Sequence, residues 1–115
     1  MDMALLAQLI GEIVADLTIE LKDEPGFEAE YLALKVKDAI IDVMSRRNYG
    51  ATSYKDKQIA LDLENFYSVI KNVARYDYNQ RGAEGQVSHE ENYIGRVWVE
   101  RDKLFNGVVA FVKVF

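Results

Sequence analysis

Apolar residues at helical spacing are the feature that most constrains this chain. Between residues 54 and 79 they follow alternating steps of four and three, which places them on one side of a helix. These positions are Ile59, Leu63, Phe66, Ile70 and Val73, with Tyr67, Ala74 and Tyr78 widening the stripe. The stripe is too wide for a two-stranded coiled coil, so we expect a central helix that packs against neighbours on two sides.

Two further helices are predicted before this one, over residues 2–22 and 28–47. The sequence Asp23-Glu24-Pro25-Gly26 separates them, because proline cannot continue a helix and glycine readily turns. Arg46 and Arg47 suit the negative end of the second helix dipole, and Asn48-Tyr49-Gly50 closes that helix. The first stripe consists of Leu6, Leu9, Ile10, Ile13, Leu17 and Leu21, and the second of Leu32, Val36, Ala39, Ile40 and Val43.

The pattern changes after Gln80. Residues 81–92 are polar, contain glycine and lack periodicity, which predicts a loop of a length that is usually functional in a compact domain. Residues 93–99 and 108–115 are β-prone, and 100–106 are compatible with a short helix. The last segment has seven apolar residues and one lysine, so we expect its own domain or a neighbouring subunit to cover it.

Together these elements predict a single, mainly α domain over residues 1–115. It is a small bundle of three main helices plus a short C-terminal helix, with a long loop and minor β segments near the C-terminus. A chain of 115 residues can form one modest hydrophobic core, and it is too short for two domains.

Composition limits the possible functions. The chain has 14 Lys and Arg against 19 Asp and Glu, a net charge of −5, which argues against a dedicated binder of nucleic acid or anionic membranes. The absence of cysteine excludes disulfides, thiolate metal sites and cysteine nucleophiles. Neither a signal peptide nor an apolar stretch long enough for a membrane span is evident, so we expect the protein to be made and kept in the cytoplasm.

Two groups of residues have the chemical types of a catalytic or metal site, but not the expected arrangement. Ser88-His89-Glu90 are consecutive, and consecutive residues cannot adopt the geometry of a catalytic triad. Glu12, Asp16 and Glu20 line one face of the first helix, where a solvated face is favoured over a cation site. We therefore expect no catalytic activity, no cofactor and no metal.

Asp77 continues the apolar stripe of the third helix. If it points inward, its carboxylate needs a basic partner, for which Arg81 and Arg96 are candidates. If it lies at a frayed helix end, it stays hydrated. Four aromatic residues flank the predicted loops, where such rings are common interface anchors, namely Tyr49, Tyr54, Tyr93 and Trp98.

A set of segments in the second half of the chain forms an ordered pattern. These are Asn65-Phe66-Tyr67-Ser68-Val69-Ile70-Lys71-Asn72-Val73-Ala74, Tyr76-Asp77-Tyr78-Asn79, Gly82-Ala83-Glu84-Gly85, Ser88-His89, Glu91-Asn92, Arg96, Arg101-Asp102-Lys103-Leu104-Phe105-Asn106-Gly107 and Phe111-Val112-Lys113-Val114. In this order they resemble the phage head–tail connector proteins, or head-completion adaptors, of tailed phages and prophages of Gram-positive bacteria. Tyr93 stands where we expect a glycine, and Trp98 where we expect a tyrosine.

The resemblance implies a structural virion protein at the head–tail junction. Such a protein assembles with itself as a ring, roughly twelve-fold, beneath the portal protein, and docks the next head-completion or tail protein. DNA passes through the channel without specific binding, and an acidic lining should repel the duplex. The expected interface residues are Glu84, Gly85, Ser88, His89, Glu91, Asn92, Arg96, Trp98, Phe111, Val112 and Val114.

Two other classes of function stay open at this point. One is a small cytoplasmic regulatory module that binds a partner helix in a groove. The other is a metal-dependent enzyme built on Glu12, Asp16 and Glu20.

Overall fold

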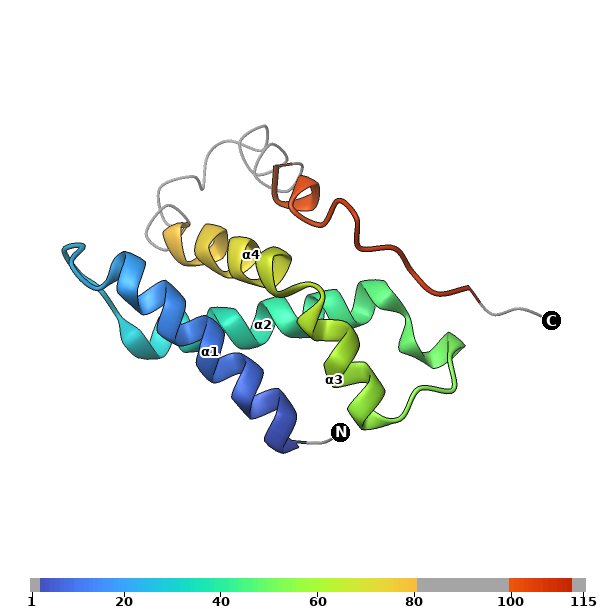
Figure 1. Ribbon diagram of the computed structural model, residues 1–115. Helices are drawn as coiled ribbons and strands as arrows, with labels where there is room; N and C mark the ends of the chain where they lie inside the picture. The colour runs from blue at the N-terminus through green and yellow to red at the C-terminus, as the bar shows by residue number, and fades with distance from the viewer. Residues whose placement is uncertain (1–2, 81–99, 113–115) are drawn as a thin grey trace.

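The computed structural model describes residues 3–80 and 100–112, and these residues form a helical bundle (Figure 1). Its elements are α1 (Met3–Leu21), α2 (Ala29–Arg47), the 3-10 helix η1 (Tyr49–Ala51), α3 (Asp56–Glu64) and α4 (Tyr67–Asn79). A further helical turn occupies residues 100–103. None of the described residues forms a strand, so the mainly α fold predicted from the sequence is confirmed.

Helix α2 lies at the centre of the bundle, packed against α4 along much of its length and crossed by α1 (Figure 1). Each predicted stripe faces this core. On α2 the buried residues are Leu32, Val36, Ala39, Ile40 and Val43, and on α1 they are Leu9, Ile13, Leu17 and Leu21. Leu6 and Ile10 pack against the same core and are partly buried. The periodicity therefore predicted the buried faces correctly.

Tyr78 joins the far end of α4 to the connection between α1 and α2. Its side chain is fully buried, and its hydroxyl accepts a hydrogen bond from the backbone N–H of Glu28 at 2.9 Å. Its ring contacts Phe27 and Tyr31, with centroids 6.1 and 5.9 Å away. The hydroxyl satisfies an N–H at the start of α2, where helical partners are missing.

The prediction of one continuous helix over 54–79 is wrong, because the chain turns at Asn65 and Phe66. There the N–H groups of Asn65 and Phe66 bond to carbonyls three residues back, and Phe66 has φ −106° and ψ 22°. The apolar stripe continues through the turn, so Leu63 and Ile70 are both buried. Since neither proline nor glycine marks this position, the apolar periodicity alone could not reveal the break.

The predicted short helix over 100–106 is shorter in the structure. One helical turn at 100–103 is followed by tight turns through Gly107, whose φ is +92°. Phe105 is buried and closes the core at this point. Residues 108–112 then run past the end of α2 without regular secondary structure, so the described part of the β-prone 108–115 segment is not a strand (Figure 1). The predicted loop 81–92 and the β-prone 93–99 lie outside the described residues.

Candidate interaction site at the C-terminal arm

Residues 108–112, called the arm here, meet the bundle at a cradle formed by Arg47, Asn48, Tyr49 and Tyr54. The backbone of Phe111 is held from both sides, since its N–H donates to the Arg47 carbonyl at 2.8 Å and its carbonyl accepts from Asn48 Nδ2 at 3.1 Å. The Arg47 carbonyl belongs to the last turn of α2, where carbonyls have no partner within the helix. The arm thus supplies a donor that the end of α2 needs.

Asn48 shapes this helix end. It has the left-handed conformation, φ 57° and ψ 57°, which asparagine tolerates better than most residues. That conformation ends α2 and leads directly into η1, which carries Tyr49. The sequence signal Asn48-Tyr49-Gly50 therefore predicted the end of the helix correctly.

The Phe111 ring is enclosed by two tyrosines and a cation. Its centroid lies 5.3 Å from that of Tyr54 in an edge-to-face arrangement and 6.0 Å from that of Tyr49. The guanidinium carbon of Arg47 lies 4.0 Å from the Phe111 centroid and 4.9 Å from that of Phe66. Edge-to-face rings and cation–π contacts both favour this geometry.

Asp62 of α3 fixes the position of Arg47. Arg47 donates from Nε and Nη2 to the two carboxylate oxygens, each at 2.9 Å, and Tyr49 donates its hydroxyl proton to the same carboxylate at 2.6 Å. Arg47 also donates from Nη1 to the carbonyl of Val109 at 2.6 Å. One side chain therefore joins the end of α2, α3 and the arm.

The raised pKa values of Arg47 and Tyr49 keep each side chain in one protonation state near neutral pH. The hydrogen bond to Asp62 raises the pKa of Arg47 above its already high value. Burial, followed by the hydrogen bond to Asp62, raises the pKa of the Tyr49 hydroxyl well above its usual range. Arg47 is thus charged and Tyr49 neutral whenever the cradle is intact.

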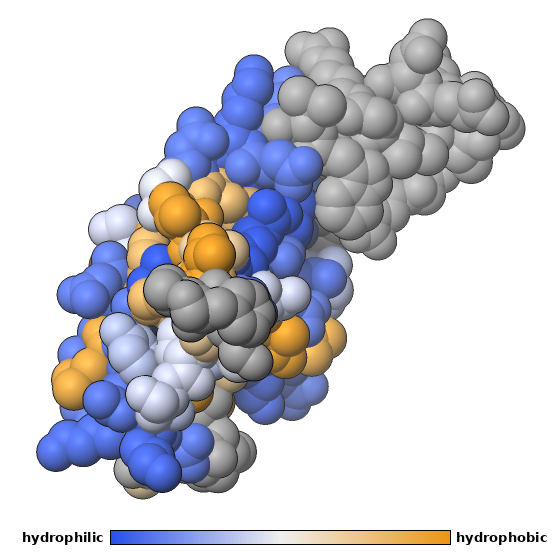
Figure 2. Space-filling model, turned by 90° about the vertical axis from the view of Figure 1, so that its right-hand side faces the viewer, coloured by the Kyte–Doolittle hydropathy of each residue, from blue (hydrophilic) through white to orange (hydrophobic). Residues whose placement is uncertain are grey.

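The outer side of the arm is apolar and exposed. Val109 is 67% exposed and Val112 is 79% exposed, although Phe111 between them is half-buried. Figure 2 looks onto this end of the molecule and shows hydrophobic surface beside mainly hydrophilic side chains. The arm is therefore anchored through Phe111, while the side chains of Val109 and Val112 are exposed.

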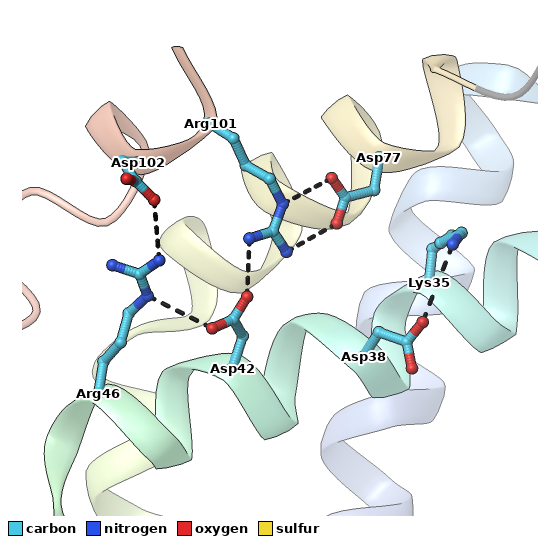
Figure 3. A network of polar contacts seen from close by, with 7 residues as sticks. All are labelled: Lys35, Asp38, Asp42, Arg46, Asp77, Arg101 and Asp102. Atoms are coloured by element: carbon cyan, nitrogen blue, oxygen red, sulfur yellow. Dashed lines mark hydrogen bonds and ion pairs between the residues drawn. The ribbon is translucent and has the colours of Figure 1, made fainter. Parts of the chain in front are cut away.

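A second polar cluster holds the segment before the arm (Figure 3). Arg101 donates to both carboxylate oxygens of Asp77 on α4, at 2.8 and 2.9 Å, and lies 2.7 Å from Asp42 on α2. The hydrogen bond to Asp77 is the main cause that raises the pKa of Arg101. Residues 100–105 are thus tied to two helices at once.

Arg46 completes this second cluster. It pairs with Asp42 at 3.4 Å and with Asp102 at 3.0 Å, and its guanidinium lies 3.7 Å from the centre of the Phe105 ring. Asp42 therefore accepts from two arginines that come from different parts of the chain.

The sequence candidates fall into two groups. Of the expected interface residues, Phe111 is anchored in the cradle and Val112 is exposed. The others lie outside the described residues, and they are Glu84, Gly85, Ser88, His89, Glu91, Asn92, Arg96, Trp98 and Val114. Tyr49 and Tyr54, which were predicted as interface anchors, both contact Phe111.

Sequence reasoning missed the polar partners of these anchors. Asp77 is half-buried and does have a basic partner, but that partner is Arg101, which was not among the candidates. Arg81 and Arg96 lie outside the described residues. The role of Asp62 gave no local signal, because its partner Arg47 is 15 positions away in the sequence, and the contact of Asp42 with Arg101 spans 59 positions.

The acidic row of α1 faces α4. Glu12 is exposed, Asp16 is half-buried and accepts a hydrogen bond from the Tyr67 hydroxyl, and Glu20 accepts two from Arg75 at 3.0 and 2.9 Å. The expectation of a solvated face is thus wrong for Asp16, which packs against Tyr67. Within residues 3–80 and 100–112, no group of three or more His, Cys, Asp or Glu is placed to hold a metal ion.

No described helix combines the length and the hydrophobicity needed to cross a membrane. Comparison of the chain with protein-family models, with curated proteins and with solved structures gives no match.

Proposed function

We propose that this chain is a structural connector of the head–tail junction of a tailed phage or prophage. It forms a ring under the portal protein, extends the DNA channel and docks the next head-completion or tail protein. Its action is architectural, with no reaction catalysed. The resemblance in sequence suggests this role, and the observation that carries it in the fold is the anchored arm with its exposed valines.

The arm supplies what a ring subunit needs. A closed ring requires two different faces on each subunit, which meet in a head-to-tail contact. Val109 and Val112 are largely exposed, and exposed apolar side chains favour contact with another protein surface. The arm would therefore form one of the two faces of this head-to-tail contact.

Four of the residues that carry the resemblance also lie in one polar cluster. Asp77, Arg101, Asp102 and Phe105 all belong to the quoted segments, and all take part in the second polar cluster. This cluster joins the helical turn at 100–103 to α2 and α4.

Net charge supports the channel role. With a charge of −5 a subunit repels DNA, and a ring multiplies this repulsion. A duplex passing through such a ring can slide, whereas a basic lining would bind its phosphates.

Light scattering on a sizing column tests the proposal, first with the protein alone and then with the portal from the same genome. A ring alone, or a stoichiometric complex with the portal ring, supports it. A monomer alone does not decide the question, since a ring can require the portal as its template. A monomer that ignores the assembled portal contradicts the proposal.

A second candidate is a cytoplasmic regulatory module that binds a partner helix. Leu34 and Ile41 favour it, because they are 51% and 63% exposed and lie two turns apart on α2. That spacing places both side chains on one face of α2, and i, i+7 pairs are typical of helices that pack against a partner. This candidate predicts a monomer or dimer without affinity for a portal, so the same experiment separates the two.

A further inference from the structure

We propose that the cradle also accepts the arm of a second copy of this chain, so that neighbouring subunits are linked by exchange of residues 108–112. The biological setting of this inference rests on the proposed function. The exchange itself is tested without a portal, so the two proposals can fail separately.

The contacts between arm and cradle are transferable as a set. Those described join Val109 and Phe111 on one side to Arg47, Asn48 and the two tyrosines on the other. All of the arm's contributions follow Gly107 in the sequence, and all of the cradle's contributions precede Lys55. A second copy can therefore supply the same hydrogen bonds and ring contacts without any change in the cradle.

Gly107 is the hinge at which the two arrangements would diverge. Its φ of +92° is a conformation that side chains other than glycine disfavour. The turn is closed by the N–H of Val108, which donates to the Phe105 carbonyl at 2.9 Å. If this one turn opens, Phe105 and the second polar cluster can stay in place while the arm leaves its own cradle.

The occupant is identified by what the cradle holds now. It binds an extended segment through one backbone N–H and two carbonyls, and it encloses an aromatic ring beside a cation. A second copy carries that segment by definition. Since the contacts are the same within and between chains, the balance between the two depends on the hinge and on the local concentration of subunits.

Reach sets a geometric condition on the exchange. Phe111 is the fourth residue after Gly107, and an extended chain spans at most about 3.6 Å per residue, or about 14 Å over these four steps. The receiving cradle must therefore lie within about 14 Å of the donor's Gly107, as expected only for closely packed subunits.

The first test biases the hinge. A valine at position 107 would meet no neighbouring atom, but its backbone would be strained at the positive φ of Gly107. Gly107→Val should therefore favour an extended backbone at this position, and with it exchange of the arm. We expect its molar mass by light scattering to rise with concentration to that of a dimer or larger assembly, above the wild-type value. Gly11→Val is the matched control, because Gly11 is exposed, has ordinary φ and also has open space around it.

The second variant shows whether the cradle is responsible. The double variant Gly107→Val/Phe111→Ala should have a molar mass no greater than that of the wild type, with unchanged helical circular dichroism. If Gly107→Val does not increase the mass, or if the increase survives removal of Phe111, the proposal is overturned.

Mixed isotope labelling gives an independent reading on the full chain. In a Gly107→Val sample that is half labelled and half unlabelled, nuclear Overhauser effects between Phe111 of one chain and Tyr54 of another arise only from exchange. Their presence supports the proposal. An assembly without them contradicts it.

Discussion

Arg101 donates two parallel hydrogen bonds to Asp77, from Nε at 2.8 Å and from Nη2 at 2.9 Å. This two-pronged geometry is the strongest form of an arginine–carboxylate contact. The remaining nitrogen lies 2.7 Å from Asp42, so one guanidinium contacts two carboxylates on different helices. Only 12% of the Arg101 side chain is exposed, which protects the contact from screening by salt.

Replacing Arg101 by methionine should lower the free energy of unfolding by about 2–4 kcal/mol, because the partly buried Asp77 then loses its counter-charge and Asp42 keeps only Arg46. Urea denaturation measures this loss. Lys103→Met is the matched control, since it removes a neighbouring positive charge from an exposed side chain and should change stability by less than about 0.5 kcal/mol. Equal losses in the two variants would show that the contacts of Arg101 do not stabilise the fold.

Tyr78→Phe should cost about 1 kcal/mol, since it removes the hydroxyl that accepts from the Glu28 N–H but keeps the buried ring. Tyr78→Ala should cost about 3–5 kcal/mol, because a cavity is added to the loss. Thermal or urea denaturation measures both. Tyr31→Phe, at a half-buried ring that contacts Tyr78, is the control and should be close to neutral. If Tyr78→Phe is neutral as well, the hydrogen bond to Glu28 has no net effect.

The helical periodicity predicted the core because burial of an apolar stripe depends on residue type and spacing alone. All five predicted positions of α2 are buried, and Leu63, Ile70 and Val73 are buried on both sides of an unpredicted break. The break itself left no trace in the pattern. Asn65 is only mildly unfavourable in a helix, and Phe66 keeps its place in the stripe.

The candidate site could be predicted only in part, for a physical reason. Phe111 and the flanking tyrosines were recognisable, because aromatic residues near loops favour interfaces. Their polar partners depend on tertiary contacts, as between Arg47 and Asp62 or between Arg101 and Asp77. Any surface arginine can pair with any nearby carboxylate, so sequence alone does not select among them.

Deprotonation of Tyr67 should lower the free energy of unfolding at alkaline pH. Burial, followed by the hydrogen bond to Asp16, raises the pKa of Tyr67 from 10.0 to about 12. Between these values the unfolded chain has lost the proton and the folded chain has kept it, so this contribution is complete below pH 10.0 and lost as pH rises toward about 12. Urea unfolding from about pH 9 to about pH 11 should therefore show a steeper decline for the wild type than for Tyr67→Phe. Parallel declines would contradict the assignment.

Asp62→Asn should loosen the arm before it unfolds the bundle. Asp62 accepts two hydrogen bonds from Arg47 and one from Tyr49, and Arg47 in turn contacts the Val109 carbonyl and the Phe111 ring of the arm. Neutralising the carboxylate weakens a charged hydrogen bond worth about 1.5–3 kcal/mol, which is about a tenfold change or more in a local opening equilibrium. The measurement is amide hydrogen exchange at Phe111, whose N–H is bonded to the Arg47 carbonyl, and we expect exchange to accelerate about tenfold there. Core amides such as that of Ile40 should change less.

Asp38→Asn is the control, because Asp38 is 49% exposed and pairs with Lys35 at 3.9 Å on the same helix. If the Phe111 amide exchanges equally slowly in Asp62→Asn and in Asp38→Asn, Asp62 does not hold the cradle in place.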